Sequence, residues 1–244
     1  MNKHMPREAG SASGGKLLAI GAHPDDLEFG CGSLLAKEAK NGAQIKLLVL
    51  SKGEAGTVGT PESRAEESVQ ASKLIGAEIE FLDMGGDCHI KNTSENAFTI
   101  AKYIREFKPD IILAPHTDEN QHPDHSETGK MARDAARFAR YGGLKELANL
   151  PVHKITALYF YPVTQDFAAP VDIVIDTTEV YETWIKMINC HTTQLQNKDY
   201  ESLVTARGKA LGVAIGTKCA QGLWKNDPVR IEKLSDLNLS SRNY

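Results

Sequence analysis

Two short stretches of the sequence hold more metal-binding side chains than turn chemistry requires. Residues 21–32 read GAHPDDLEFGCG, with His23, Asp25 and Asp26 between an apolar run and a helix-like stretch. Residues 115–125 read PHTDENQHPDH, where three histidines and two aspartates fall within ten residues. An aspartate is a favoured helix N-cap, and proline suits a first helical turn. Neither role accounts for the histidines or for a second carboxylate.

Zinc chemistry explains these residue types. Catalytic zinc usually takes three His or carboxylate ligands at roughly 2.0–2.2 Å and keeps one position open. His23 and Asp26 are three residues apart, and on a tight turn into a helix this spacing directs both side chains to one point. One histidine from residues 115–125 would complete the set. Asp25 then stays beside the metal, able to take a proton from water whose pKa zinc lowers towards about 7.

The elements that must position these stretches alternate between strand and helix. Strands are expected at 17–22, 45–51, 78–84, 111–117, 157–162 and 171–177. Helices are expected at 27–42, 61–76 and 95–107, after the strand at 111–117 as far as Arg140, and at 179–194 and 200–212. This order predicts an α/β fold with a Rossmann-like, doubly wound, mostly parallel sheet. In such sheets ligands bind beyond the carboxyl ends of the strands, where both histidine-containing stretches stand.

Length and composition bound the remaining possibilities. The chain has 244 residues with 41% hydrophobic content, enough for one sizeable α/β domain, expected at residues 16–244. Residues 1–15 are rich in Gly and Ser and are expected to be a disordered tail or an expression-tag remnant. The net charge of −4 is spread without a long single-sign block, so no nucleic-acid-binding footprint is visible.

The sequence also limits location and metal-ligand type. Apolar runs fall far short of the roughly 18 residues of a membrane span, and no signal-peptide core is visible, so a cytoplasmic protein without membrane contact is expected. Four scattered cysteines form no C-x-x-C pair. Neither a disulfide framework nor a thiolate zinc knuckle is therefore indicated, and any metal must use His and carboxylate ligands.

The paired motifs resemble those of the LmbE/PIG-L family of zinc-dependent N-deacetylases. That family carries A-H-P-D-D after the first strand and H-P-D-H later, which read here as residues 22–26 and 122–125. The resemblance covers nearly the whole chain from Lys16, including residues 59–67 and 200–207. It implies an LmbE-like fold, Zn²⁺ as cofactor, and hydrolysis of the N-acetyl group of a small amino-sugar substrate containing N-acetylglucosamine. The layout looks closest to bacterial deacetylases of the bacillithiol type.

The resemblance also implies roles for individual residues. Zinc would be held by His23, Asp26 and His125. Asp25 would be the general base, and His122 would stabilise the oxyanion or protonate the leaving amine. Asp124 is interpreted as a second-shell residue that orients a histidine.

Two weaker local matches and one mismatch complete the assignment. Arg64 would bind substrate hydroxyls, but it could instead pair with an acidic neighbour on its own helix. Tyr200 would reach the scissile carbonyl, but it could instead only pack against a helix face. Glu28 resembles an acidic residue that follows the family's first motif, yet one residue intervenes here, and its role is left unassigned.

Other functions remain open at this point. Related amidases that cleave thiol conjugates share the same zinc motifs, so amide hydrolysis is the broader expectation. A non-catalytic zinc-binding protein is a second possibility. A nucleotide-binding Rossmann-like protein is a third, although G-x-G-x-x-G is missing and Gly30-Cys31-Gly32 falls too late to cradle a pyrophosphate. The family also implies a homo-oligomer, a trimer or hexamer.

Overall fold

The structure, a computed structural model, describes residues 14–118, 122–163 and 170–233. Most of the tail expected at residues 1–15 thus lies outside the described residues. The described strands form one seven-stranded sheet in the order β3-β2-β1-β4-β5-β7-β6. β1 to β5 pair in parallel, whereas β7 runs antiparallel to both β5 and β6. The strands are β1 Lys16–Gly21, β2 Gln44–Val49, β3 Glu78–Phe81, β4 Ile111–Pro115, β5 Ala157–Tyr161, β6 Ile173–Asp176 and β7 Ala220–Lys225.

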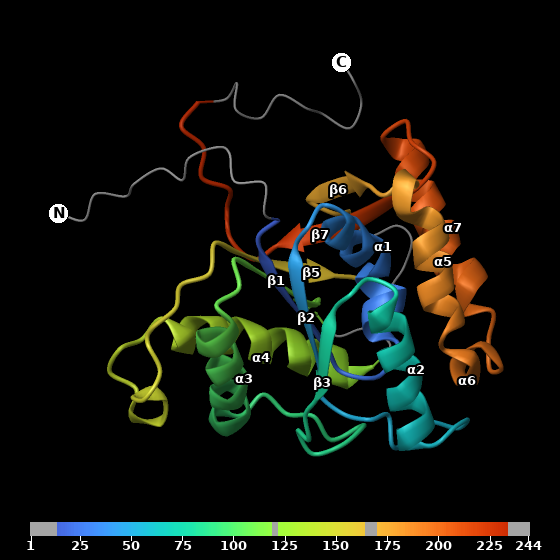
Figure 1. Ribbon diagram of the computed structural model, residues 1–244. Coiled ribbons are helices and arrows are strands. Elements are labelled where there is room, and N and C mark those ends of the chain that lie inside the picture. Colours follow the sequence, from blue (N-terminus) through green and yellow to red (C-terminus); the bar gives the residue numbers. More distant parts are fainter. Residues whose placement is uncertain (1–13, 119–121, 164–169, 234–244) are drawn as a thin grey trace.

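Helices cover both faces of the sheet, which confirms the doubly wound prediction. Figure 1 shows α3 and α4 on one face and α1, α2, α5 and α7 on the other. The helices are α1 Asp26–Lys40, α2 Pro61–Lys73, α3 Ser94–Phe107, α4 Pro123–Ala139, α5 Tyr181–Asn189, α6 Thr192–Leu195 and α7 Tyr200–Ala214, with short 3-10 helices η1 Lys145–Leu147 and η2 Thr178–Val180. Among the described residues, no helix is both long enough and apolar enough to cross a membrane.

The alternation of side chains along β1 divides the core into two layers. Leu18 and Ile20 pack with apolar residues of α3 and α4, while Leu17 and Ala19 pack with those of α1. Successive strand residues point to opposite faces, so a parallel strand covered by helices on both sides reads as a continuous apolar run. This is why the run at residues 17–22 was readable as a strand.

The strand order creates a switch point between β1 and β4. The chain fills the sheet from β1 to β3 in one direction, then returns to place β4 on the other side of β1. The loops after β1 and β4 therefore leave neighbouring strands in opposite directions, and a crevice opens between them at the carboxyl ends. Both histidine-containing stretches start at this crevice.

The glycines of α1 serve close packing. A Cβ at Gly30 would lie 2.5 Å from the ring of Tyr161, and one at Gly32 would lie 2.9 Å from Trp184. Cys31 between them has a non-helical φ of −142°. The Gly30-Cys31-Gly32 segment thus lets two aromatic rings approach the helix.

Two expectations from the sequence need correction. The helix expected at 179–194 is broken into η2, α5 and α6, with His191 at the last break. The strand β7 was not predicted, because its sequence, AQGLWK, contains a glutamine and a glycine instead of an apolar alternation. Its Gln221 is nonetheless buried, because its side-chain amide donates a hydrogen bond of 2.9 Å to the carbonyl of Gly30.

Candidate metal centre

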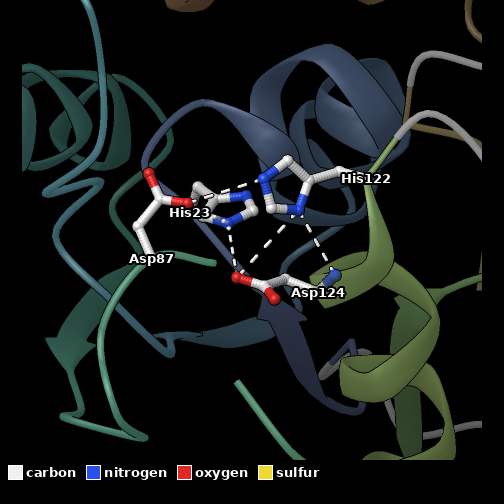
Figure 2. A group of neighbouring side chains, drawn as sticks. All are labelled: His23, Asp87, His122 and Asp124. Carbon is white, nitrogen blue, oxygen red and sulfur yellow. Dashed lines mark hydrogen bonds and ion pairs between the residues drawn. The ribbon is translucent and has the colours of Figure 1, made fainter. Parts of the chain in front are cut away.

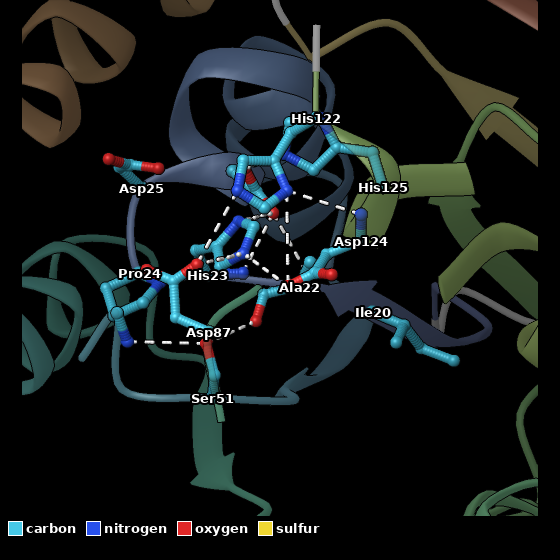
Figure 3. Close-up of polar contacts among 12 residues, drawn as sticks. Ile20, Ala22, His23, Pro24, Asp25, Ser51, Asp87, His122, Asp124 and His125 are labelled. Atoms are coloured by element: carbon cyan, nitrogen blue, oxygen red, sulfur yellow. Dashed lines mark hydrogen bonds and ion pairs between the residues drawn. The ribbon is translucent and has the colours of Figure 1, made fainter. Parts of the chain in front are cut away.

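Loops after three parallel strands converge on the crevice. The turn after β1 carries His23, Asp25 and Asp26, and the loop after β3 carries Asp87. The first turn of α4, which follows β4, carries His122, Asp124 and His125. Figure 3 shows the three imidazole rings gathered together, with Asp25 to one side of them.

Asp26 is fixed before any ligand binds. One carboxylate oxygen, Oδ2, accepts hydrogen bonds from the backbone N–H groups of Ala22 at 2.8 Å and His23 at 2.9 Å. The other oxygen, Oδ1, lies 3.0 Å from Nε2 of His125. Burial alone would raise the pKa of Asp26, but His125 and His23 outweigh it and hold the pKa well below its ordinary value. Asp26 is therefore ionised at neutral pH and faces His125.

The H-P-D-H motif forms the start of α4. His122 is the N-cap residue, and its Nδ1 accepts a hydrogen bond of 3.3 Å from the backbone N–H of Asp124. Pro123 occupies the first helical position, where its missing N–H has no cost. This first turn directs His125 inwards, where it is buried, and leaves the His122 side chain 29% exposed at the cavity.

The ring of His23 is held on both sides. Its Nδ1 lies 3.5 Å from Oδ2 of Asp26. Its Nε2 lies 3.2 Å from Oδ2 of Asp124 and 3.1 Å from Oδ1 of Asp87, as Figure 2 shows. Burial alone would lower the pKa of His23, but its bonds to Asp124 and Asp26 raise the pKa well above the ordinary value.

Two groups of ligand atoms in this region are close enough to hold a metal ion. One is His23, Asp26 and His125, all buried; the other is His23, Asp87, His122 and Asp124. We favour the first, because it leaves Nε2 of His23 to donate to Asp124 and Asp87, the carboxylate partners that orient a metal-bound histidine. A tetrahedral ion with N and O ligands at roughly 2.0–2.1 Å spaces them about 3.3 Å apart. Asp26 faces His23 with Oδ2, 3.5 Å from Nδ1, and His125 with Oδ1, 3.0 Å from Nε2. One ligand atom from each of the three residues lies within 4.8 Å of the others, which is close enough for a shared ion.

Asp25 lies next to this group without belonging to it. Its backbone is left-handed, with φ 98°, and its side chain makes no capping hydrogen bond although it occupies the N-cap position of α1. Helix capping by its side chain therefore does not explain the aspartate at position 25. Burial, and then the charge of Asp26, raise the pKa of Asp25 to about 7.

Arg64 points into the site instead of pairing on its own helix. It is buried, and its guanidinium donates to the carbonyls of Gly53 at 2.9 Å and Pro24 at 3.1 Å. The same group lies 3.3 Å from Oδ2 of Asp25. A surface pairing with neighbouring acidic residues of α2 is therefore wrong, and Arg64 instead contacts the loops after β1 and β2.

A cavity of about 200 Å³ opens at these residues. It is lined by His23, Asp25, Asp26, Phe29, Arg64, Asp87, His122, His125, Val163, Gln194 and Tyr200. The ring of Tyr200 stacks on Phe29 at 5.2 Å, so this residue both packs on α1 and lines the cavity. The side-chain Nε2 of Gln194 is buried and has no hydrogen-bond partner within the described part of the chain.

Three features of the site were missed from the sequence. Asp87 follows β3, and the rule that located the first two loops would have found it. Gln194 gave no signal, because its position depends on the break before α6. Glu28, left unassigned, is buried with an oxygen 3.1 Å from Nε2 of His191, a residue with no motif around it.

Comparison with known proteins identifies the family that this sequence matches. Residues 18–136 match the family model PIG-L, described as GlcNAc-PI de-N-acetylase. The chain is 28% identical over 199 residues to the diacetylchitobiose deacetylase of Thermococcus kodakarensis, covering 76% of this chain and 72% of that protein. It is 35% identical over 128 residues to the uncharacterized deacetylase YaiS of Escherichia coli, covering 50% of this chain and 68% of that protein.

A solved structure extends the comparison to the fold. The 4-carboxy-2-hydroxymuconate hydratase of Pseudomonas putida superposes with a TM-score of 0.80 at 24% identity, covering 90% of this chain and 99% of that one. The shared fold thus also occurs in a protein named for a different reaction. The identity to YaiS over two thirds of that protein and the family match through both histidine-containing motifs together establish that this chain belongs to the PIG-L family.

Proposed function

We propose that this chain is a zinc-dependent deacetylase that hydrolyses the N-acetyl group of a small substrate containing N-acetylglucosamine, releasing acetate and a free amine. The observation that carries the proposal is Asp25. It is a carboxylate with a raised pKa, in the same cavity as a three-residue ligand set but outside that set. A site that only stored metal would have no need of such a group.

The donor set suits zinc. Two histidines and one carboxylate are ligands that catalytic zinc takes, although the same set is also used by non-haem iron(II). When bound by His23, Asp26 and His125, zinc supplies a Lewis acid for the amide carbonyl and makes water a stronger acid. We assign the ion to zinc on the family match, and metal analysis of the purified protein tests the assignment.

Asp25 is suited to move the proton of the attacking water. A base with a pKa near the working pH both accepts and returns a proton readily. We assign Asp25 the first transfer, from water as its oxygen bonds to the carbonyl carbon. The same proton then goes to the amine nitrogen as the C–N bond breaks, so that acetic acid and a neutral amine form, and the acid then loses its remaining proton to solvent as acetate.

His122 is suited to hold the oxyanion. Burial, and then the nearby His23, lower the pKa of His122, so the ring is neutral at neutral pH. Because Nδ1 accepts the N–H of Asp124, the proton of the neutral ring is on Nε2. That N–H faces the cavity and donates to the oxygen on which negative charge develops.

The cavity favours a small uncharged group. Its volume of about 200 Å³ is below the roughly 300–1,000 Å³ of pockets that enclose drug-sized ligands, so we place the acetamide and its sugar ring inside and any further unit outside. We assign Arg64, Gln194 and Tyr200 to contacts with this ring. The names of the relatives, which include diacetylchitobiose and inositol-linked N-acetylglucosamine deacetylases, support the same substrate class.

Two other functions fit the described site less well. Among the described residues that line the cavity, Arg64 is the single lysine or arginine, and it already faces Asp25. Apart from the proposed zinc ion, a polycarboxylate substrate such as that of the hydratase would therefore meet carboxylates without a second cation to match it. A nucleotide is disfavoured for the same reason, because Asp25 and Asp26 occupy the N-terminus of α1 where a pyrophosphate would bind.

Metal analysis combined with acetate release tests the proposal. The purified protein should contain about one zinc per chain and release acetate from at least one of four substrates: diacetylchitobiose, an inositol glycoside of N-acetylglucosamine, N-acetylglucosaminyl malate and an N-acetylated thiol conjugate. Preference for the malate would support the bacillithiol-type assignment, whereas release of a free amine from the thiol conjugate without acetate would support the amidase alternative. Bound iron in place of zinc, or hydration of 4-carboxy-2-hydroxymuconate without acetate release, would refute the proposal.

A further inference from the structure

A thiol lies at the rim of the cavity beside two side chains that bind metals. Cys88 follows Asp87 in the loop after β3, and it is exposed with a left-handed φ of 68°. Its Sγ is 3.4 Å from Oδ1 of Asp87 and 3.7 Å from Nε2 of His122. Those two atoms are themselves 3.6 Å apart. Three different ligand types thus form a nearly equilateral triangle.

The triangle has the dimensions of one face of a tetrahedral zinc site. With Zn–S at about 2.3 Å and Zn–N or Zn–O at about 2.0–2.1 Å, sulfur lies about 3.5–3.6 Å from the other ligands, which lie about 3.3 Å from each other. We propose that Asp87, Cys88 and His122 form a second site for a thiophilic divalent cation, and that its occupation inhibits the enzyme. The binding stands on this geometry alone, whereas the inhibition also rests on the proposed function of His122.

The second site does not compete with the first for a ligand. The larger group of candidate ligands includes His23, but a metal on Nδ1 of His23 leaves the proton on Nε2. That nitrogen then donates to Asp124 and Asp87 and cannot bind a second ion. Cys88 supplies the third ligand that the rim otherwise lacks.

The charges around Cys88 favour a cation over thiol chemistry. Desolvation and the neighbouring Asp87 raise the pKa of the Cys88 thiol, with a further contribution from Asp124. The free thiol is therefore protonated and a weak nucleophile at neutral pH. The same two carboxylates attract a divalent cation. When the cation binds, the S–H bond breaks, an S–metal bond forms, and the proton passes to solvent without any change in oxidation state.

Binding at this site excludes the proposed role of His122. A metal on Nε2 takes the lone pair of that nitrogen, so the ring proton must move to Nδ1. The long hydrogen bond from the N–H of Asp124 is then lost, and Nε2 no longer has a proton to donate to a substrate oxygen. Because this capping bond is given up, we expect the second ion to bind more weakly than the first.

Cadmium titration of the zinc-loaded protein tests the binding. Cadmium should produce the ultraviolet absorption of a metal–thiolate bond with one equivalent per chain, and Cys88→Ser should abolish it. Cys190→Ser is the matched control, because Cys190 is the other cysteine with some exposure among the four and is not among the residues that line the cavity. Absorption that persists in Cys88→Ser, or none in the wild type, would overturn the site.

Zinc inhibition tests the consequence. Excess zinc should inhibit acetate release by the wild type and Cys190→Ser, whereas Cys88→Ser should need at least about tenfold more zinc, because loss of even an outer partner weakens metal binding about 10–100-fold. Equal sensitivity of Cys88→Ser would overturn the inhibitory role. If no variant releases acetate, the proposed function fails, while the cadmium absorption still decides the site.

Discussion

Replacing Asp25 by asparagine should make the metal-free protein more stable while it removes most of the activity. The pKa of Asp25 lies at about 7, against an ordinary value of 3.8. At about 1.4 kcal/mol per pH unit, keeping this group ionised costs the fold roughly 4 kcal/mol. Asparagine has no charge and tolerates a left-handed backbone. The lost contact with Arg64 offsets part of the gain, so we expect a net stabilisation of about 1–3 kcal/mol at pH 8.

The effect has a defined dependence on pH. The pKa of Asp25 is raised in the folded state, so the folded wild type holds this proton at pH values where the unfolded chain has already lost it. The free energy of unfolding of the wild type therefore falls as the pH rises from about 4 to about 7. The advantage of Asp25→Asn should therefore be small near pH 4, grow up to about pH 7 and stay constant above. Thermal unfolding of chelator-treated protein across this range should show a rise in Tm of roughly 3–10 °C at pH 8.

The neighbouring residue provides the control. The pKa of Asp26 is lowered, so its ionised form stabilises the fold, and Asp26→Asn should destabilise the metal-free protein at pH 8. In zinc-loaded protein, Asp25→Asn should keep its metal and lose about 10²–10⁴ in kcat, whereas Asp26→Asn should lose the metal. An Asp25→Asn protein that is less stable than the wild type at pH 8, or one that turns over normally, would refute the reasoning.

Four further outcomes are expected. Gln194→Leu should raise KM at least about tenfold with little change in kcat, measured by acetate release, whereas the exposed Gln196 should tolerate the same change. Arg105→Met should lower the free energy of unfolding by roughly 3–5 kcal/mol in denaturant titrations, because the buried Arg105 guanidinium donates to five backbone carbonyls. Chelation should abolish acetate release, and added zinc should restore it. Sedimentation should detect a homo-oligomer, and a 26.7 kDa species alone would contradict that expectation.

The sequence was sufficient for those features that local chemistry determines. The apolar runs of β1 and β4 predicted buried parallel strands, and the carboxyl-end rule then brought His23 and His125 to one crevice. Their convergence follows from the strand order, in which β1 and β4 are neighbours. The meeting of the two stretches could therefore be predicted before any side chain was placed, whereas the choice of His125 as a ligand came from the family resemblance and stays a prediction.

The features that could not be predicted depend on contacts distant in sequence. Gln221 can be buried in β7 because its side-chain amide donates a hydrogen bond to the carbonyl of Gly30 in α1. Glu67 holds the start of α6 through Thr192 and Thr193 at 2.7 to 2.9 Å, and this anchor places Gln194 at the cavity. Neither residue type nor spacing predicts such contacts, since a glutamate or a glutamine on a helix is usually solvated.

The backbone explains how two adjacent, identical carboxylates differ so much. The left-handed φ of Asp25 turns its side chain towards Arg64, while Asp26, already helical, points back to the amides of Ala22 and His23. Amides and histidines hold Asp26 ionised, whereas burial and the charge of Asp26 itself make Asp25 easier to protonate. Aspartate is among the few residue types other than glycine that accept this backbone conformation. The same tight turn thus selects the residue type at position 25 and sets the charge environment that suits it to exchange a proton.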